Sequence, residues 1–151
     1  MLTKSIFFTI FLWNYLTAQN VEYLQSETFK QTNMPFSEAV RVGNLFFLSG
    51  QIGEVYTDIP GETKLVGGGI KPETIQTMEN IKSVLERNGL SLDNVVKCTC
   101  MLADISDWAE MSNEYIKFFP KNKPARSTFA GTGLAFGARV EIECIAVINE
   151  K

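Results

Sequence analysis

The sequence contains no histidine among its 151 residues. This absence excludes Ser-His-Asp and Cys-His catalysis, zinc sites of the HExxH type and histidine general acids. Any chemistry that the protein performs must therefore use carboxylates, Arg, Lys, Ser, Thr, Tyr, backbone amides or water.

Cysteine is scarce as well. The chain has only Cys98, Cys100 and Cys144, and no pair has the CxxC spacing of redox or zinc motifs. On one strand, the Cα atoms of Cys98 and Cys100 would lie about 6.6 Å apart, which is near the upper limit for a disulfide. We interpret all three as buried small apolar residues. A bond from Cys144 to either of the others stays open if the protein is exported.

Clustered positive charge is also missing. Lys and Arg number 14 against 17 Asp and Glu, the net charge is −3, and no Lys/Arg stripe stands out. This argues against nucleic acid as the main partner, because phosphate binding needs clustered cations. The length suits one domain with one core.

The N-terminus has the pattern of a secretory signal peptide. Lys4 supplies a positive start, residues 5–17 form an apolar run, and Ala18 is a small residue at a cleavage point. The run is shorter than the ~20 residues of a membrane span. We therefore expect residues 1–18 to be removed and the protein to be periplasmic or secreted, with no membrane contact after cleavage. An uncleaved anchor or a disordered leader is the alternative, and without a functional signal the protein would be cytoplasmic.

The rest of the chain is expected to comprise a polar, irregular N-terminal extension, residues 19–33, and one domain, residues 34–151. Apolar and alternating runs predict strands at 38–42, 45–49, 64–66, 95–102, 127–130 and 139–148. One-sided apolar patterns predict a helix at 71–88 and another that starts at a Ser106 N-cap and ends before Lys121. This order predicts an α+β fold, with both helices on one face of a mixed sheet.

The core of each helix is predicted from its apolar stripe. The stripe of the first helix consists of Ile75, Met78, Ile81, Val84 and Leu85, and Gly89 caps its end. The stripe of the second consists of Trp108, Met111, Tyr115, Phe118 and Phe119.

The last strand carries the first chemical signal. Glu141 and Glu143 share one strand face with Ile145 and Val147. Carboxylates beside aliphatic residues indicate an interface or a pocket, where desolvation raises a carboxyl pKa and favours proton transfer near neutral pH. The alternative is a pair of solvated surface glutamates.

Two other segments have residues suited to binding. Arg126, after Pro124 and at the start of a strand, has a guanidinium that can hold a carboxylate through two parallel hydrogen bonds. In Ser49-Gly50-Gln51-Ile52, the glycine allows a ligand to approach the backbone. The alternatives are a surface arginine paired with an acid, and a glycine that only ends a strand.

Six stretches in this order resemble the RidA/YjgF/YER057c family, over about Met34 to Val147. They are residues 35–40, 42–45, 49–52, 95–99, 124–127 and 140–143, which include Ser-Gly-Gln-Ile, Pro-Ala-Arg-Ser and Glu-Ile-Glu. The resemblance implies a chorismate-mutase-like α+β fold and a homotrimer with active sites in the clefts between subunits. It also implies hydrolysis of enamine/imine intermediates, such as 2-iminobutanoate and 2-iminopropanoate, to 2-keto acids and ammonia.

The resemblance assigns roles to particular residues. Arg126 matches the arginine that grips the substrate carboxylate, Glu141 the glutamate that positions water, and Ser49 and Gly50 residues that line the pocket. Three positions of the pocket differ from the usual family pattern: Phe36 replaces tyrosine, Thr128 replaces cysteine and Ser112 replaces asparagine.

The implied reaction needs no metal or cofactor, because an α-imino acid already has an electrophilic carbon. Three rival functions remain. The fold could serve as a non-catalytic, small-carboxylate-binding or chaperone-like module, or as a hydrolase of another C–N bond. The third is the ribonuclease activity attributed to some relatives, against which the acidic charge and the missing histidine both count.

Overall fold

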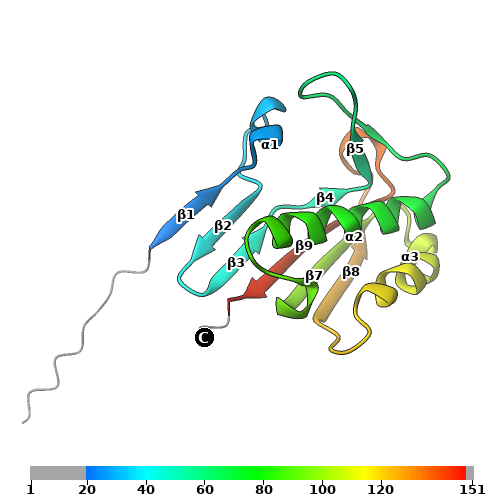
Figure 1. Ribbon diagram of the computed structural model, residues 1–151. Helices are drawn as coiled ribbons and strands as arrows, with labels where there is room; N and C mark the ends of the chain where they lie inside the picture. Colours follow the sequence, from blue (N-terminus) through cyan, green and yellow to red (C-terminus); the bar gives the residue numbers. More distant parts are fainter. Residues whose placement is uncertain (1–19, 149–151) are drawn as a thin grey trace, which may run out of the picture.

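The computed structural model describes residues 20–148, which form a curved sheet with helices packed on it (Figure 1). The signal peptide expected at residues 1–18 lies outside this range. The strands are β1 Val21–Leu24, β2 Ala39–Val42, β3 Leu45–Leu48, β4 Gln51–Ile52, β5 Glu54–Tyr56, β6 Thr63–Leu65, β7 Val95–Leu102, β8 Ala125–Ala130 and β9 Val140–Val147. The helices are α1 Glu27–Gln31, α2 Ile70–Arg87 and α3 Trp108–Tyr115, with 3-10 turns at Leu92–Asn94, Ile105–Asp107, Ile116–Phe118 and Ala135–Gly137.

The main sheet is mixed. Its strand order is β1-β2-β3-β9-β7-β8, with β4 also paired to β9, while β5 and β6 form a separate ribbon. β7 and β8 run parallel and the other pairs are antiparallel. α2 and α3 lie on the same face of the sheet (Figure 1). This confirms the predicted α+β fold.

Sequence periodicity explains the packing of the central strands. Alternate residues of β9 are buried beneath the helices, and Glu141 and Glu143 point to the other face. Gly43 has a positive φ in the turn of the predicted β2–β3 hairpin. Gly89 also has a positive φ, and the N–H of Leu90 bonds to the carbonyl of Leu85, which closes the end of α2.

Two predicted core residues are instead exposed. Ile75 is 42% accessible on α2 and Trp108 is 47% accessible on α3. On α2, the buried positions nearest the sheet include Thr74 and Thr77, whose hydroxyls donate to carbonyls one turn earlier. Their hydrogen bonds are satisfied within the helix, so threonines are accommodated where an apolar stripe alone would predict larger side chains.

The segment expected to be irregular is ordered and belongs to the same sheet. β1 pairs with β2 along its whole length, and the Ser26 hydroxyl caps α1 by accepting from the N–H of Phe29. A different cap also begins the second helical region: the Asp104 carboxylate accepts from the N–H of Ser106, so Ser106 is not the N-cap. A 3-10 turn then leads into α3, which ends at Tyr115.

The cysteines are buried, as predicted, but two of them are bonded. Cys98 on β7 and Cys144 on β9 are directly opposite partners and form a disulfide, while Cys100 is a free buried thiol. The bond from Cys144 that the sequence left open is therefore formed, and its partner is Cys98. Strand register explains the bond, because directly opposite residues of antiparallel strands have their side chains on the same face.

The second face of the sheet exposes apolar side chains. Tyr23 of β1 is 74% accessible, and Val21, Leu45 and Phe47 are also exposed. Strand pairing places these residues in rows with Ile145 and Val147 of β9. A contiguous apolar surface of this kind is typical of a protein–protein interface.

Candidate functional site

A β-bulge sets the position of Glu141. Phe47 pairs with Ile145, and Gln51 pairs with Ile142. Gln51 is four residues after Phe47, whereas Ile142 is only three residues before Ile145, so the β3–β4 segment contains one extra residue. Gly50 lies in this insertion, directly over the Glu141 carboxylate. A β-carbon at Gly50 would overlap Glu141 Oε1, so glycine is required here by close approach.

The Glu141 carboxylate has no hydrogen-bond or ion-pair partner among the described residues. Burial raises its pKa above the usual range, and the nearby charge of Glu143 raises it further. Glu141 is therefore a free, partly desolvated carboxylate, which is the state expected of a proton acceptor.

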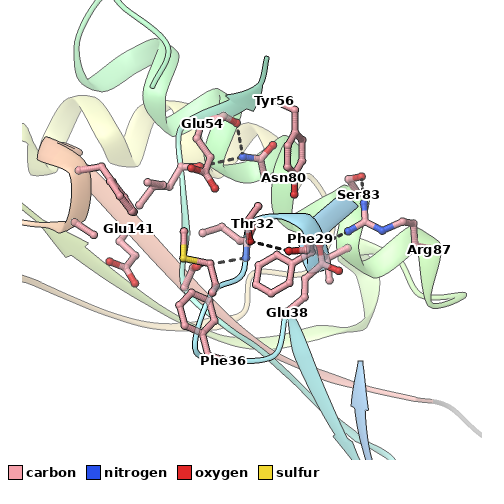
Figure 2. A pocket seen from close by; sticks show the side chains of 17 residues that line it. Phe29, Thr32, Phe36, Glu38, Glu54, Tyr56, Asn80, Ser83, Arg87 and Glu141 are labelled. Atoms are coloured by element: carbon pink, nitrogen blue, oxygen red, sulfur yellow. Dashed lines mark hydrogen bonds and ion pairs between the residues drawn. The ribbon is translucent and has the colours of Figure 1, made fainter. Parts of the chain in front are cut away.

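Glu141 faces a pocket of about 310 Å³. Gly50, Gln51 and Ile52 form one wall and α2 forms another. Figure 2 shows Glu141 on the opposite side of the pocket from Arg87 and Ser83, with Phe36 at one end. The remaining lining residues are Phe29, Thr32, Met34, Glu38, Glu54, Tyr56, Asn80, Val84, Ala135 and Phe136.

Arg126 lies in a separate corner, between β8 and α3. Its guanidinium carbon is 4.9 Å from the centre of the Tyr115 ring and 5.7 Å from that of Trp108, distances at which aromatic rings attract a cation. Its Nη2 donates to the Ser112 hydroxyl at 3.0 Å. No described carboxylate forms an ion pair with it, so the guanidinium is held in place and can accept an anionic ligand.

Two buried hydroxyls in the same corner have no partner. Thr128 Oγ1 and Tyr115 Oη are the buried side-chain N or O atoms of the described chain without a hydrogen bond. Arg126 and Thr128 alternate along β8 on the face of Cys98 and Cys100. Because unpaired buried polar atoms are costly, their concentration beside Arg126 indicates a place where a ligand or another chain completes the bonding.

Arg126 and Glu141 do not meet within one chain. Arg126 pairs with Cys98, on the helix-covered face, whereas Glu141 points to the other face. β7 separates their strands, and Glu141 pairs with Met101, three positions from Cys98, so their Cα atoms are on the order of 14 Å apart. A site that uses both residues therefore needs two copies of the chain.

The other predicted site residues divide between these two places. Phe36 and Gly50 lie in the Glu141 pocket, and Ser112 and Thr128 lie beside Arg126. Ser49 does not line the pocket; its hydroxyl donates to the carbonyl of Ser37 and supports the turn that precedes β4.

Sequence reasoning missed several lining residues. Phe29 comes from the segment interpreted as irregular, Met34 from the first residue of the predicted domain, and Phe136 from a turn region. The stacking role of Trp108 and Tyr115 was also missed, because periodicity assigned both to the core. No local pattern signals these roles, which arise where distant segments meet.

Among residues 20–148, no group of three or more Cys, Asp or Glu side chains is arranged to hold a metal ion. No helix in that range is long and apolar enough to cross a membrane.

Comparison with known proteins identifies the family. The family model Endoribonuclease L-PSP matches residues 9–148. The chain is 40% identical over 114 residues to Reactive Intermediate Deaminase A, chloroplastic, of Arabidopsis thaliana, a match that covers 76% of this chain and 59% of that protein. The chain belongs to the RidA/YjgF/YER057c family. It is also 38% identical over 113 residues to the 2-iminobutanoate/2-iminopropanoate deaminase of Homo sapiens, with 75% of this chain and 80% of that protein covered.

Solved structures of the RidA/YjgF/YER057c family have the same fold. The crystal structure of YEO7_yeast superposes with a TM-score of 0.76 at 39% identity, over 86% of this chain and 100% of that one. E. coli TdcF, crystallised with bound serine, superposes with a TM-score of 0.68 at 28% identity, over 77% of this chain and 90% of that one.

Proposed function

We propose that the protein hydrolyses 2-imino acids of the 2-iminopropanoate and 2-iminobutanoate type to 2-keto acids and ammonia. The observation that carries this proposal is the Glu141 carboxylate, which is unpaired, partly buried and held against Gly50 with a raised pKa. The deaminase names of the human and Arabidopsis relatives support the same reaction.

We further propose a homotrimer in which Arg126 of one chain completes the Glu141 pocket of another. Arg126 and Glu141 face opposite sides of the sheet, and neither has an ionic partner among residues 20–148. The apolar rows that include Tyr23 and Phe47 provide a surface for association. Light scattering of the purified protein should give three chains per particle, and a monomer at micromolar concentration would refute the shared site.

The proposed reaction follows from this arrangement. Arg126 holds the substrate carboxylate, which fixes the imine carbon near Glu141. Water attacks that carbon and the C=N π electrons move to nitrogen, while Glu141 takes the water proton and returns it to nitrogen. Glu141 then moves the hydroxyl proton to the amine, so the C–N bond breaks, ammonia leaves and the C=O bond forms. The substrate supplies its own electrophile, so the balance requires only water.

The rival functions make different demands on the pocket. A ribonuclease must hold the phosphate backbone with clustered cations, but the net charge of the chain is −3 and its Lys and Arg residues form no stripe in the sequence. A non-catalytic module would bind a small carboxylate at Arg126 without turnover. A coupled assay, in which an amino acid oxidase with catalase generates the imine and keto acid release is followed, separates binding from catalysis.

Arg126→Ala tests the anchor. Loss of two charge-assisted hydrogen bonds should lower kcat/KM by about 100-fold or more. The matched control is Arg41→Ala, because Arg41 lies on β2 outside both corners. Unchanged turnover in Arg126→Ala would contradict the anchor role, and a wild type that does not exceed spontaneous hydrolysis would contradict the reaction itself.

We also propose that the protein is exported after cleavage near Ala18. The disulfide between Cys98 and Cys144 supports this, because disulfides persist in oxidising compartments and are rare in the cytosol. Mass spectrometry of the mature protein should find Gln19 or a neighbour at its N-terminus. An intact Met1 would overturn the proposal.

A further inference from the structure

The pocket extends well beyond the reacting groups. From Gly50 and Glu141 it continues to Ser83 and Arg87 of α2, beneath α1 (Figure 2). Its volume of about 310 Å³ equals the liquid volume of about ten water molecules. A substrate whose side chain is only a methyl or ethyl group would leave most of this space to water.

The polar groups at the inner end of the pocket already bond to one another. The Asn80 amide donates to the carbonyls of Ile52 and Glu54 at 3.0 and 2.9 Å. Arg87 donates to the Ser83 hydroxyl and forms an ion pair with Glu38. These groups therefore offer little to a polar ligand, and a charged ligand group would have to displace an existing partner.

Most of the remaining lining residues are aromatic or apolar, and the polar ones are Thr32, Gln51 and Glu54. The rings of Phe29 and Phe36 pack with their centres 5.8 Å apart, and Met34, Tyr56 and Phe136 also line the pocket. Aromatic walls of this kind gain most from burying another apolar or aromatic group.

Phe136 is unusual in its backbone as well. It has a φ of 56° in the turn before β9 and its side chain is 71% accessible. A large residue rarely adopts this left-handed conformation, and such strained positions cluster at ligand sites. An exposed ring held in this way beside the pocket is available to close over a ligand.

Helix α1, which carries the lining residue Phe29, is anchored to the rest of the chain at both of its ends. The N–H of Ser26 donates to Glu38 Oε2 at 3.1 Å, at the start of α1. At the other end of α1, Gly61 fits so closely against the carbonyl of Gln31 that a β-carbon there would overlap it. Phe29 is thus presented by an anchored segment, which favours a defined shape for the pocket.

We propose that the part of the pocket between Glu141 and α2 is a subsite for the substrate side chain. It selects 2-imino acids with large apolar side chains, aromatic or long aliphatic, and Phe29 and Phe136 are its specificity-determining residues. The proposal rests on the proposed imine hydrolysis and adds the substrate class to it. The imine carbon would lie near Glu141 and the substrate side chain would point toward α2, against the two rings.

The test compares two imines generated in the coupled assay from alanine and phenylalanine. The wild type should favour the phenylalanine-derived imine in kcat/KM by about tenfold or more, the usual gain from filling an apolar pocket. Phe29→Ala and Phe136→Asn should each lower this ratio by about tenfold. Asparagine is chosen because it tolerates the left-handed backbone that Phe136 adopts.

Ile75→Ala is the matched control, because Ile75 is an exposed apolar residue of α2 that does not line the pocket. Its ratio should equal that of the wild type. A wild type that shows no preference, or a ratio that is unchanged in both Phe29→Ala and Phe136→Asn, overturns the subsite.

Calorimetry with stable keto acid products separates failure of the subsite from failure of the reaction. Phenylpyruvate should bind the wild type about tenfold more tightly than pyruvate, and Phe29→Ala should remove that difference. If no imine is hydrolysed but this selectivity persists, the proposed reaction is wrong and the subsite stands. If 2-iminopropanoate is hydrolysed and phenylpyruvate has no advantage, the subsite is wrong and the reaction stands.

Discussion

The Arg126 corner and the Glu141 pocket are built from the same sheet but differ in almost every physical respect. Arg126 is a cation between two aromatic rings, with a hydroxyl as its hydrogen-bond partner. Glu141 is a carboxylate on the other face, held beneath a bulge, and it has no partner in the described part of the chain. Each of the two places therefore contains one charge that no other residue between 20 and 148 neutralises.

This difference shows how period-2 alternation can divide a site between chains. Residues 126 and 141 lie on strands separated only by β7, yet their side chains point to opposite faces. In the homotrimer that we propose, association of the chains brings the Arg126 corner of one chain to the Glu141 pocket of another. The unpaired charge in each place is the reason for proposing that the site is shared.

Removing the charge of Glu141 should give the largest effect. Glu141→Gln should lower kcat by about 10² to 10⁴, because a positioned general base contributes that much. The variant should be at least as stable as the wild type. A carboxyl group whose pKa is raised on folding opposes folding when it is charged, and the amide removes that charge. The melting temperature at neutral pH should therefore be equal or higher. Activity and thermal melts measure the two effects.

The matched control for Glu141→Gln lies two residues away on the same strand face. Glu143→Gln removes an equal charge from an exposed position. Its kcat should stay within about threefold of wild type, as for surface changes in general. An equal loss in both variants would mean that net charge, and not a specific base, supports catalysis.

Gly50→Ala should break the pocket while leaving the Arg126 corner intact. The added methyl overlaps the Glu141 carboxylate, so that side chain must move. A displacement of about 1 Å in a catalytic group can cost about 100-fold in rate. Gly67→Ala is the control, since a β-carbon at Gly67 meets nothing within 4 Å. Wild-type rates in Gly50→Ala would mean that the position of Glu141 is not important.

Mixed oligomers test whether the two corners complement each other between chains. Arg126→Ala and Glu141→Gln chains with different affinity tags are co-expressed, and particles containing both are purified. In a cyclic trimer that contains both kinds of chain, one of the three clefts pairs an intact Arg126 with an intact Glu141. Activity of the purified mixed particles should therefore return to roughly a third of wild type. That result would show that the two groups are supplied by separate chains.

Co-expression of either variant with the double variant serves as the control. Such mixtures contain no cleft with both groups intact, and they should remain inactive. If the first mixture is equally inactive although mixed particles form, Arg126 and Glu141 must come from the same chain.

Much of the fold is predictable because it follows local periodicity. The β2–β3 hairpin, α2 and β9 appear where alternation, a stripe or a turn glycine predicts them. The alternation of β9 also predicts that Glu141 shares a face with Ile145. These features depend on neighbours in sequence, which a single chain displays directly.

The rest depends on contacts between distant segments. The disulfide of Cys98 with Cys144 requires the register of β7 on β9, which no local pattern encodes. β1 is ordered because β2 is available to pair with it, and Phe29 lines the pocket because Glu38 anchors α1. The bulge at Gly50 likewise follows from how β3 and β4 share one partner strand.

The pH dependence of kcat offers a finer comparison of the two corners. Arginine stays protonated at all accessible pH values, so the acidic limb of the profile should report Glu141. Because burial and the charge of Glu143 raise the pKa of Glu141, the limb should lie above the value of about 4.3 typical of glutamate. Activity rises as pH increases through this limb, because only the deprotonated carboxylate accepts a proton from water.

Glu143→Gln sharpens this assignment. Removal of the Glu143 charge takes away the smaller of the two causes that raise the pKa of Glu141, so the limb should move to lower pH but remain above the ordinary glutamate value, since burial persists. The profile of kcat is the right measure, because in the complex the substrate carboxylate offsets the charge of Arg126 and leaves burial and Glu143 to set the pKa. An acidic limb at the ordinary pKa of glutamate, unchanged in Glu143→Gln, would show that Glu141 is solvated in the working enzyme. The contrast between a buried, unpaired carboxylate and a stacked, hydrogen-bonded guanidinium would then not account for catalysis.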